Sequence, residues 1–224
     1  MDKNSGTVTF RWWGQACFSL TDNAGLTVLV DPFPNDFGYA SPTAQPQVVL
    51  ITHEHRDHNA VGNVLGTPTV VRGPGEHEKA GVRFRGLAAK HDDQGGGQRG
   101  DDTIFVWEMA GIKVAHVGDL GHLLNDEQVK AIGPVDALMI PVGGYYTIDA
   151  AEAVEVAKQL QARVVLPMHY KTAAIPQFPV APLEDCLPAF PSEWRIERPE
   201  SPNWTLRAEE LPGEQVRVVV LRYE

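Results

Sequence analysis

The most informative stretch of the chain is VVLITHEHRDHNAVG, residues 48–62. It opens with an apolar run typical of a buried strand. Three of the chain's eight histidines then follow within six residues, with an aspartate between them. Imidazoles placed this closely repel one another when protonated, so a solvated loop or a helix cap explains them poorly. We interpret the stretch as a metal-binding loop at the end of a strand.

The spacing inside this loop predicts two neighbouring metal ions. His53 and His55 alternate along an extended strand end, so their imidazoles point the same way. Asp57 and His58 turn off that line and can face a second ion. Imidazole and carboxylate ligands without thiolates suit zinc, and also manganese and iron. We expect two divalent ions, with zinc as the preferred metal and manganese or iron as alternatives.

The composition indicates one globular α/β domain over residues 1–224. The chain is 43% hydrophobic and 21% charged, and no Gly/Ser-rich or charge-rich linker divides it. Its formal charge of −10 disfavours nucleic acid and anionic membrane surfaces as partners. No apolar run approaches the roughly 20 residues that span a bilayer, and the N-terminus has no apolar signal core. We therefore expect a cytoplasmic protein without a membrane span.

Strand and helix patterns alternate in the second half of the chain. Helices are predicted at residues 125–133 and 147–162, where each pattern begins with a capping residue or helix formers. This alternation predicts sheets covered by helices. Strands are predicted at residues 7–14, 16–22, 26–33, 46–52, 67–71, 82–89, 103–110, 112–118, 136–142, 162–168, 203–209 and 214–224.

The loop motif resembles the metallo-β-lactamase superfamily. THEHRDH matches the HxHxDH signature of that superfamily, and His91 in AAKHDD, Asp119 in HVGDLGH and His169 in VVLPMHYKT follow in the same order. HVGDLGH, PVGGYYTID and PMHYKT are most similar to a small single-domain branch of metal-dependent hydrolases. That branch includes L-ascorbate-6-phosphate lactonase and N-acylphosphatidylethanolamine phospholipase D.

The resemblance implies a four-layer αββα sandwich with two mixed sheets face to face and the metals at one sheet edge. It also implies the metal ligands, which are His53, His55 and His91 for the first ion, Asp57, His58 and His169 for the second, and Asp119 as a bridge. His116 competes with His91, because both precede Asp119. We favour His91, which stands at a strand-to-loop break, and expect His116 to orient a ligand from within its strand.

The chemistry implied is hydrolysis by a hydroxide that bridges the two ions, with Asp57 relaying the proton. We expect a small-molecule substrate, namely an anionic ester such as a phosphodiester or a lactone. One alternative is an iron-dependent oxidoreductase of the same superfamily. Another is a nuclease, which the acidic balance disfavours. Assembly into a homo-oligomer stays open.

Residues next to the ligand motifs are further candidates. His122 in GDLGH is a candidate for proton transfer, and a polar cap after the strand is an equally good reading of it. The substrate candidates lie in the glycine-rich loop, after the turn PVGG and after His169, and each is otherwise an ordinary solvated or packing residue. They are Arg99, Tyr145, Tyr146, Thr147 and Lys171.

Overall fold

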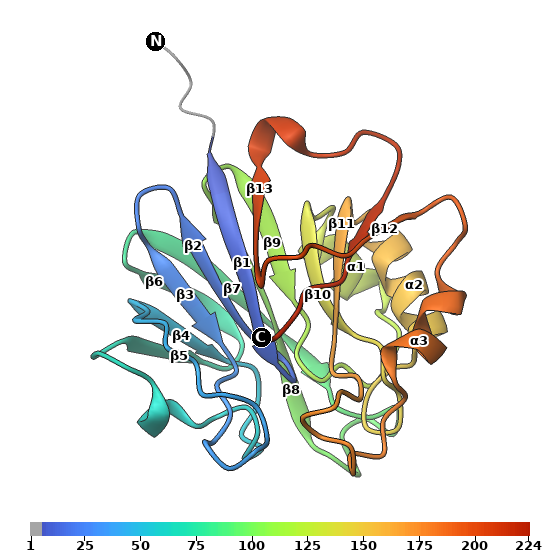
Figure 1. Cartoon of the computed structure of the whole chain (residues 1–224), viewed down its shortest axis with the longest axis horizontal. Coiled ribbons are helices and arrows are strands. Elements are labelled where there is room, and N and C mark those ends of the chain that lie inside the picture. Colours follow the sequence, from blue (N-terminus) through green and yellow to red (C-terminus); the bar gives the residue numbers. More distant parts are fainter. Residues whose placement is uncertain (1–5) are drawn as a thin grey trace.

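The computed structural model describes residues 6–224, and residues 1–5 of the expected domain and N-terminus lie outside the described residues. Two sheets lie against each other (Figure 1). The first has the strand order β13-β1-β2-β3-β4-β5 and the second β12-β14-β11-β10-β9-β8-β7-β6. Both sheets are mixed, because antiparallel hairpins and parallel crossovers occur in each. The two mixed sheets of the predicted αββα sandwich, packed face to face, are confirmed.

The first sheet takes its strands from the N-terminal part of the chain, apart from β13. Alternation in β1 sends Val8, Phe10 and Trp12 into the main core between the sheets, and Trp13 to the outer face. That outer face packs against a second cluster that includes Phe33 and Tyr39. The strands are β1 (Thr7–Gly14), β2 (Cys17–Asp22), β3 (Thr27–Val30), β4 (Val48–Ile51), β5 (Thr69–Arg72) and β13 (Asn203–Arg207).

The second sheet carries the α-helices of the described residues on its side of the sandwich (Figure 1). Its central strands β9, β10 and β11 are parallel and fully or almost fully buried, as expected for strands covered on both faces. The strands are β6 (Gly75–Lys79), β7 (Val82–Lys90), β8 (Asp101–Met109), β9 (Ile112–His116), β10 (Ala137–Pro141), β11 (Val164–Met168), β12 (Arg195–Glu197) and β14 (Arg217–Val219).

Both predicted helices form, and each begins with a capping box. Asn125 caps α1 (Asp126–Ile132) and Asp149 caps α2 (Ala150–Gln159), in each case by accepting a backbone N–H three residues on. The proline-rich segment adds a short helix, α3 (Leu183–Cys186). Over the outer face of the first sheet, the chain provides the 3₁₀ turn Val61–Asn63 and extended loops. None of the helices in residues 6–224 is long and apolar enough to span a membrane.

The topology brings five strand ends to one edge of the sandwich. In the first sheet β3 and β4 are parallel, so Asp31 and the THEHRDH loop leave at the same edge. In the second sheet β7, β9 and β11 run in one direction, because β8 is antiparallel to both β7 and β9. Their ends lead to His91, Asp119 and His169. Ligand motifs separated by more than a hundred residues therefore meet at this edge.

Candidate metal centre

The carboxylate of Asp119 lies at the middle of the histidine cluster. Its Oδ2 atom is 3.2 Å from His58 Nε2, 3.2 Å from His91 Nε2, 3.1 Å from His169 Nε2 and 4.0 Å from His53 Nε2. All five residues are at most 7% exposed. Four imidazoles that converge on one buried oxygen form a compact nitrogen and oxygen ligand set, which is the kind that divalent transition metals take.

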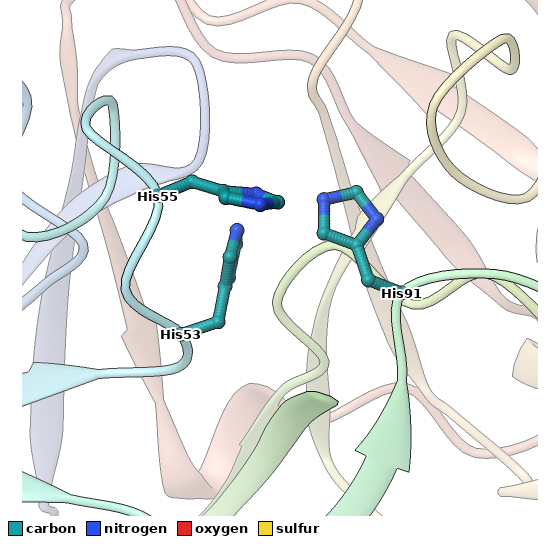
Figure 2. A group of neighbouring side chains, drawn as sticks. All are labelled: His53, His55 and His91. Atoms are coloured by element: carbon teal, nitrogen blue, oxygen red, sulfur yellow. The ribbon is translucent and has the colours of Figure 1, made fainter. Parts of the chain in front are cut away.

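Three groups of side chains have the spacing of a metal site, and two of them match the expected ligand sets; the third consists of Asp31, His53 and His58. His53, His55 and His91 form one group, with the potential ligand atom of each within 4.8 Å of the others. Figure 2 shows these three rings pointing toward one another, two from the loop after β4 and one from the end of β7. The structure thus brings together the residues expected to hold the first ion.

The second group also adjoins Asp119. Asp57, His58 and His169 also place ligand atoms within 4.8 Å of one another, and Asp57 Oδ2 is 3.5 Å from His58 Nε2. The backbone of His169 adopts a left-handed conformation with φ of 53°, which is uncommon for a residue other than glycine and is typical of functional sites. The residues expected to hold the second ion are therefore also together.

Buried polar atoms without partners test whether metal ions fit this cluster. Among the described residues, His53 Nε2, His58 Nε2 and Asp119 Oδ1 are buried and form no hydrogen bond. A buried polar atom left unpaired costs about 1–3 kcal/mol, so such atoms rarely gather without a reason. These atoms face the shared centre of the cluster, and a pair of bound cations would satisfy them. The donor set fits divalent metal ions.

Asp31 and Thr52 are buried and orient two of the histidine ligands. Neither residue was predicted to do so from the sequence. Asp31 Oδ2 accepts from the hydroxyl of Thr52 at 2.7 Å and lies 3.0 Å from His58 Nδ1. Thr52 Oγ1 in turn lies 3.0 Å from His53 Nδ1. Because the outer nitrogens of His53 and His58 are engaged in this way, their Nε2 atoms are left to face the centre. Asp31 could have been found from the sequence, because it directly follows strand β3 at the same edge of the sheet as the THEHRDH loop.

Opposite charges offset one another in part within the cluster when no metal is bound. Burial lowers the pKa of His53 to about 4, and the neighbouring His58 adds to this effect. The pKa of His58 itself is raised although burial acts the other way, because the carboxylates of Asp119 and Asp57 adjoin it. The pKa of Asp119 is lowered despite burial, because His169 and His58 contact it. An imidazolium at His58 therefore offsets part of the carboxylate charge when no ion is bound.

His116 lies in a different environment from His91. Its ring is fully buried within β9, its Nε2 donates to the backbone oxygen of Ala16 at 2.9 Å, and its Nδ1 accepts from the backbone N–H of Gly118 at 3.1 Å. Both nitrogens are therefore used in the fold. His91 Nε2 instead faces Asp119. This geometry supports His91 as the ligand, and it ties His116 to the backbone that leads into Asp119.

His122 does not line the hollow beside the histidine cluster. One ring nitrogen is 2.7 Å from the backbone oxygen of Leu123, and the other accepts from the backbone N–H of Lys90 at 3.1 Å. Both nitrogens thus hold the connection between β7 and the loop after Asp119. Because neither is free to exchange protons with a substrate, we assign His122 a structural contact and leave it out of the proposed reaction.

A hollow of about 350 Å³ opens beside the cluster. Of the substrate candidates, Arg99 and Tyr146 line it. The hollow is not lined by Tyr145, Thr147 or Lys171. Tyr145 packs on Tyr146 and is 66% exposed, the Thr147 hydroxyl donates to the backbone oxygen of Ile148, and the backbone of Lys171 forms a β-bridge with Pro182. The remaining lining residues are Phe37, His55, Arg56, Asp57, His91, Asp119, His169 and Phe178, of which Phe37, Arg56 and Phe178 were missed from the sequence.

Comparison with known proteins agrees with this architecture. The profile of the beta-lactamase superfamily domain matches residues 9–169. The chain belongs to the metallo-β-lactamase superfamily. It is 33% identical over 187 residues to a UPF0173 metal-dependent hydrolase of Thermoplasma acidophilum, a match that covers 72% of this chain and 82% of that protein. The superfamily predicted from THEHRDH is confirmed, and the likeness to the two enzymes of the small branch stays a prediction.

Solved structures share the fold over nearly the whole chain. A Thermotoga maritima protein assigned as a Zn-dependent hydrolase of the superfamily superposes with a TM-score of 0.76 at 36% identity, covering 96% of this chain and 98% of that one. The diiron β-hydroxylase CmlA of Streptomyces venezuelae shares the fold alone, with a TM-score of 0.53, 17% identity and coverage of 72% and 44%.

Proposed function

We propose that this protein is a metal-dependent hydrolase with a dinuclear centre that cleaves a small anionic ester, either a phosphodiester or a lactone. The observation that carries the proposal is the convergence of four imidazoles on Asp119, beside a hollow of about 350 Å³ that Arg99 lines. In the proposal, His53, His55 and His91 hold the first ion, and Asp57, His58 and His169 hold the second. Asp119 would be a ligand of both.

Bound divalent ions would supply Lewis acidity and activate water at neutral pH, with zinc preferred and manganese or iron as alternatives. The side chains of the protein would position the attacking water and accept its proton. Asp57 accepts from Gln15 Nε2 through Oδ2 at 2.9 Å. The Asp57 pKa is lowered although burial acts the other way, because His58 adjoins it. An ionised Asp57 that Gln15 holds in place beside the hollow can accept a proton from the attacking water.

The hollow selects the substrate by charge and size. Among residues 6–224, Arg56 forms an ion pair with Asp36, whereas Arg99 forms none. The Arg99 guanidinium is thus available to an anionic group of the substrate. A hollow of about 350 Å³ is at the small end of ligand-binding pockets and suits a small molecule. The superfamily's nuclease and iron oxidoreductase activities remain as alternatives for the experiment to separate.

The test combines metal content with turnover. Protein purified without chelator should contain close to two equivalents of divalent transition metal by elemental analysis. Asp119→Ala should lose both, because Asp119 contacts ligands of both groups. Turnover is then compared on bis(p-nitrophenyl) phosphate, a sugar-phosphate lactone, a neutral lactone and a short RNA. Preference for the neutral lactone or the RNA would contradict the anionic-ester proposal, and metal-dependent oxygen consumption would replace a hydrolase with an oxidoreductase.

A further inference from the structure

Three aromatic rings form a connected wall on one side of the hollow. Phe178 lies 6.0 Å from Phe37 and 5.3 Å from Tyr146, measured between ring centroids. Phe178 also packs 5.8 Å from the ring of His169, which places the wall directly against the second group of ligands. We call Phe37, Tyr146 and Phe178 the aromatic wall. Each of its members is half-buried, so part of each ring faces the hollow.

The aromatic wall forms the apolar part of the lining beside the metal ligands. Ligand pockets are commonly lined by apolar and aromatic side chains, with a small number of polar groups that fix the orientation of the ligand. Phe37, Tyr146 and Phe178 come from three segments far apart in the sequence, namely the loop after β3, the turn after β10 and the segment after β11. They meet only because the strand ends lead to one edge. Their shared position therefore provides an apolar aromatic surface beside the metal ligands, where the proposed ester bond would be cleaved.

Arg99 continues the wall as its charged end. Its guanidinium lies 5.6 Å from the centroid of the Tyr146 ring and donates to the backbone oxygen of Tyr145 at 3.2 Å. A guanidinium has five N–H donors, so this single bond leaves donors for a ligand. The hollow thus offers an aromatic surface and a free cation at adjacent positions.

The loop that carries Arg99 is built around one buried carboxylate. Asp92 accepts four backbone N–H bonds, from Gln94 at 2.9 Å, Gly96 at 2.8 Å, Gln98 at 2.9 Å and Arg99 at 2.7 Å. Four bonds to one side chain hold the loop in a single shape. Arg99 is therefore positioned before a ligand arrives, which lowers the entropy lost on binding.

We propose that the aromatic wall is a binding subsite for a flat apolar group of the substrate, with Arg99 binding an anionic group next to it. This inference rests on the proposed function for the position of the scissile ester. It narrows the substrate class to anionic esters with an aromatic or similarly planar group beside the anion. Aromatic rings pair favourably at centroid separations of about 4.5–7 Å, so the part of each wall ring that faces the hollow can pair with a planar group of the substrate.

The test measures binding, so that it does not depend on turnover. Phenylphosphonate and methylphosphonate carry the same anion and differ only in the flat group, and neither has an ester bond to cleave. Their affinities for the metal-loaded protein are measured by calorimetry. We expect phenylphosphonate to bind roughly tenfold more tightly, because stacking and ring burial add to the shared contacts of the anion. Equal affinities in the unaltered protein would overturn the inference.

Variants separate the two halves of the subsite. Phe178→Ala should bring the affinity ratio of the two phosphonates close to one, and Phe178→Leu should give an intermediate ratio while preserving the packing against His169. Arg99→Gln should weaken both phosphonates about equally and leave their ratio unchanged. Leu65→Ala is the matched control, because Leu65 is 45% exposed and does not line the hollow, and it should change neither affinity.

The outcomes distinguish this inference from the proposed function. If no ester of the turnover panel is cleaved but the affinity ratio and its loss in Phe178→Ala hold, the subsite stands and the hydrolase proposal fails. If anionic esters are cleaved but the ratio is the same in Phe178→Ala as in the unaltered protein, the hydrolase proposal stands and the aromatic wall is only structural packing.

Discussion

Two glycines beside the metal centre should be unable to accept a side chain. A Cβ atom at Gly121 would lie 2.3 Å from the backbone nitrogen of Asp92 and 2.4 Å from the carbonyl carbon of His91. A Cβ atom at Gly143 would lie 2.3 Å from the backbone oxygen of His169. Since non-bonded contacts of carbon are most favourable at about 3.5–4.0 Å, each alanine would have to push the neighbouring backbone by roughly 1 Å.

These shifts act on different ligand groups. Displacing His91 by about that amount would disturb its 3.2 Å approach to Asp119, while displacing His169 would disturb the second group. We expect Gly121→Ala to lose mainly the first ion and Gly143→Ala mainly the second. Each should retain about one equivalent of metal. Because the clash is with backbone rather than with a flexible side chain, we also expect a destabilisation of about 1–3 kcal/mol or more.

The assays are elemental analysis after dialysis and urea denaturation of the metal-free proteins. Gly62→Ala is the matched control, because a Cβ atom at Gly62 has no neighbour within 4 Å, and it should keep both ions and nearly unaltered stability. If Gly121→Ala bound two equivalents of metal and was as stable as the unaltered protein, the metal site would not require the close approach of the His91 backbone to Gly121. Loss of both ions from both variants would refute the separation into two ligand groups.

Three further outcomes are expected. His91→Ala should lose metal from the first group and most activity, whereas His116→Ala should lower the metal affinity or the activity roughly 10–100-fold. If His116→Ala lost more metal than His91→Ala, the roles of the two residues would be exchanged. Arg99→Ala should raise KM for an anionic ester while Lys171→Ala should not, because only Arg99 lines the hollow; equal effects in steady-state kinetics would contradict this. Metal uptake should release a proton from His58, whose pKa is raised by two carboxylates although burial opposes them. As the pH is lowered, the ion held by the group of Asp57, His58 and His169 should therefore be lost at a higher pH than the ion held by the other group. Metal titrations between pH 5 and 9 check this, and loss of both equivalents at the same pH would contradict it.

The strands that were predicted from the sequence are those with a strong apolar signal. The range 7–14 matches β1, and VVLI of β4 lies inside the predicted range 46–52. Two edge strands were missed for physical reasons. β6 has the sequence GEHEK and is almost wholly exposed, so it has no apolar alternation to detect. β12 has three residues and exists only because it pairs with β14.

The candidate ligands could be found from the sequence because they cluster in short motifs at strand ends. Their supporting residues could not be found in the same way. Gln15 and Asp57 are 42 residues apart, and Asp31 and His58 are 27 residues apart, so each contact exists only once the strands are paired. The aromatic wall is a stronger case, since Phe37 and Phe178 occupy loops without a motif of their own.

The metal centre depends on the packing of the two sheets against each other. The THEHRDH loop and Asp31 belong to the first sheet, while His91, Asp119 and His169 follow strands of the second. The contact between His58 and Asp119 therefore joins the two sheets across their interface. The chain makes this interface from its largest buried side chains, including Trp12, Phe10 and Phe105. A close-packed core of this kind is rigid, so it can hold ligands from separate sheets at fixed distances. This accounts for the position of the polar metal centre at the edge of the apolar core.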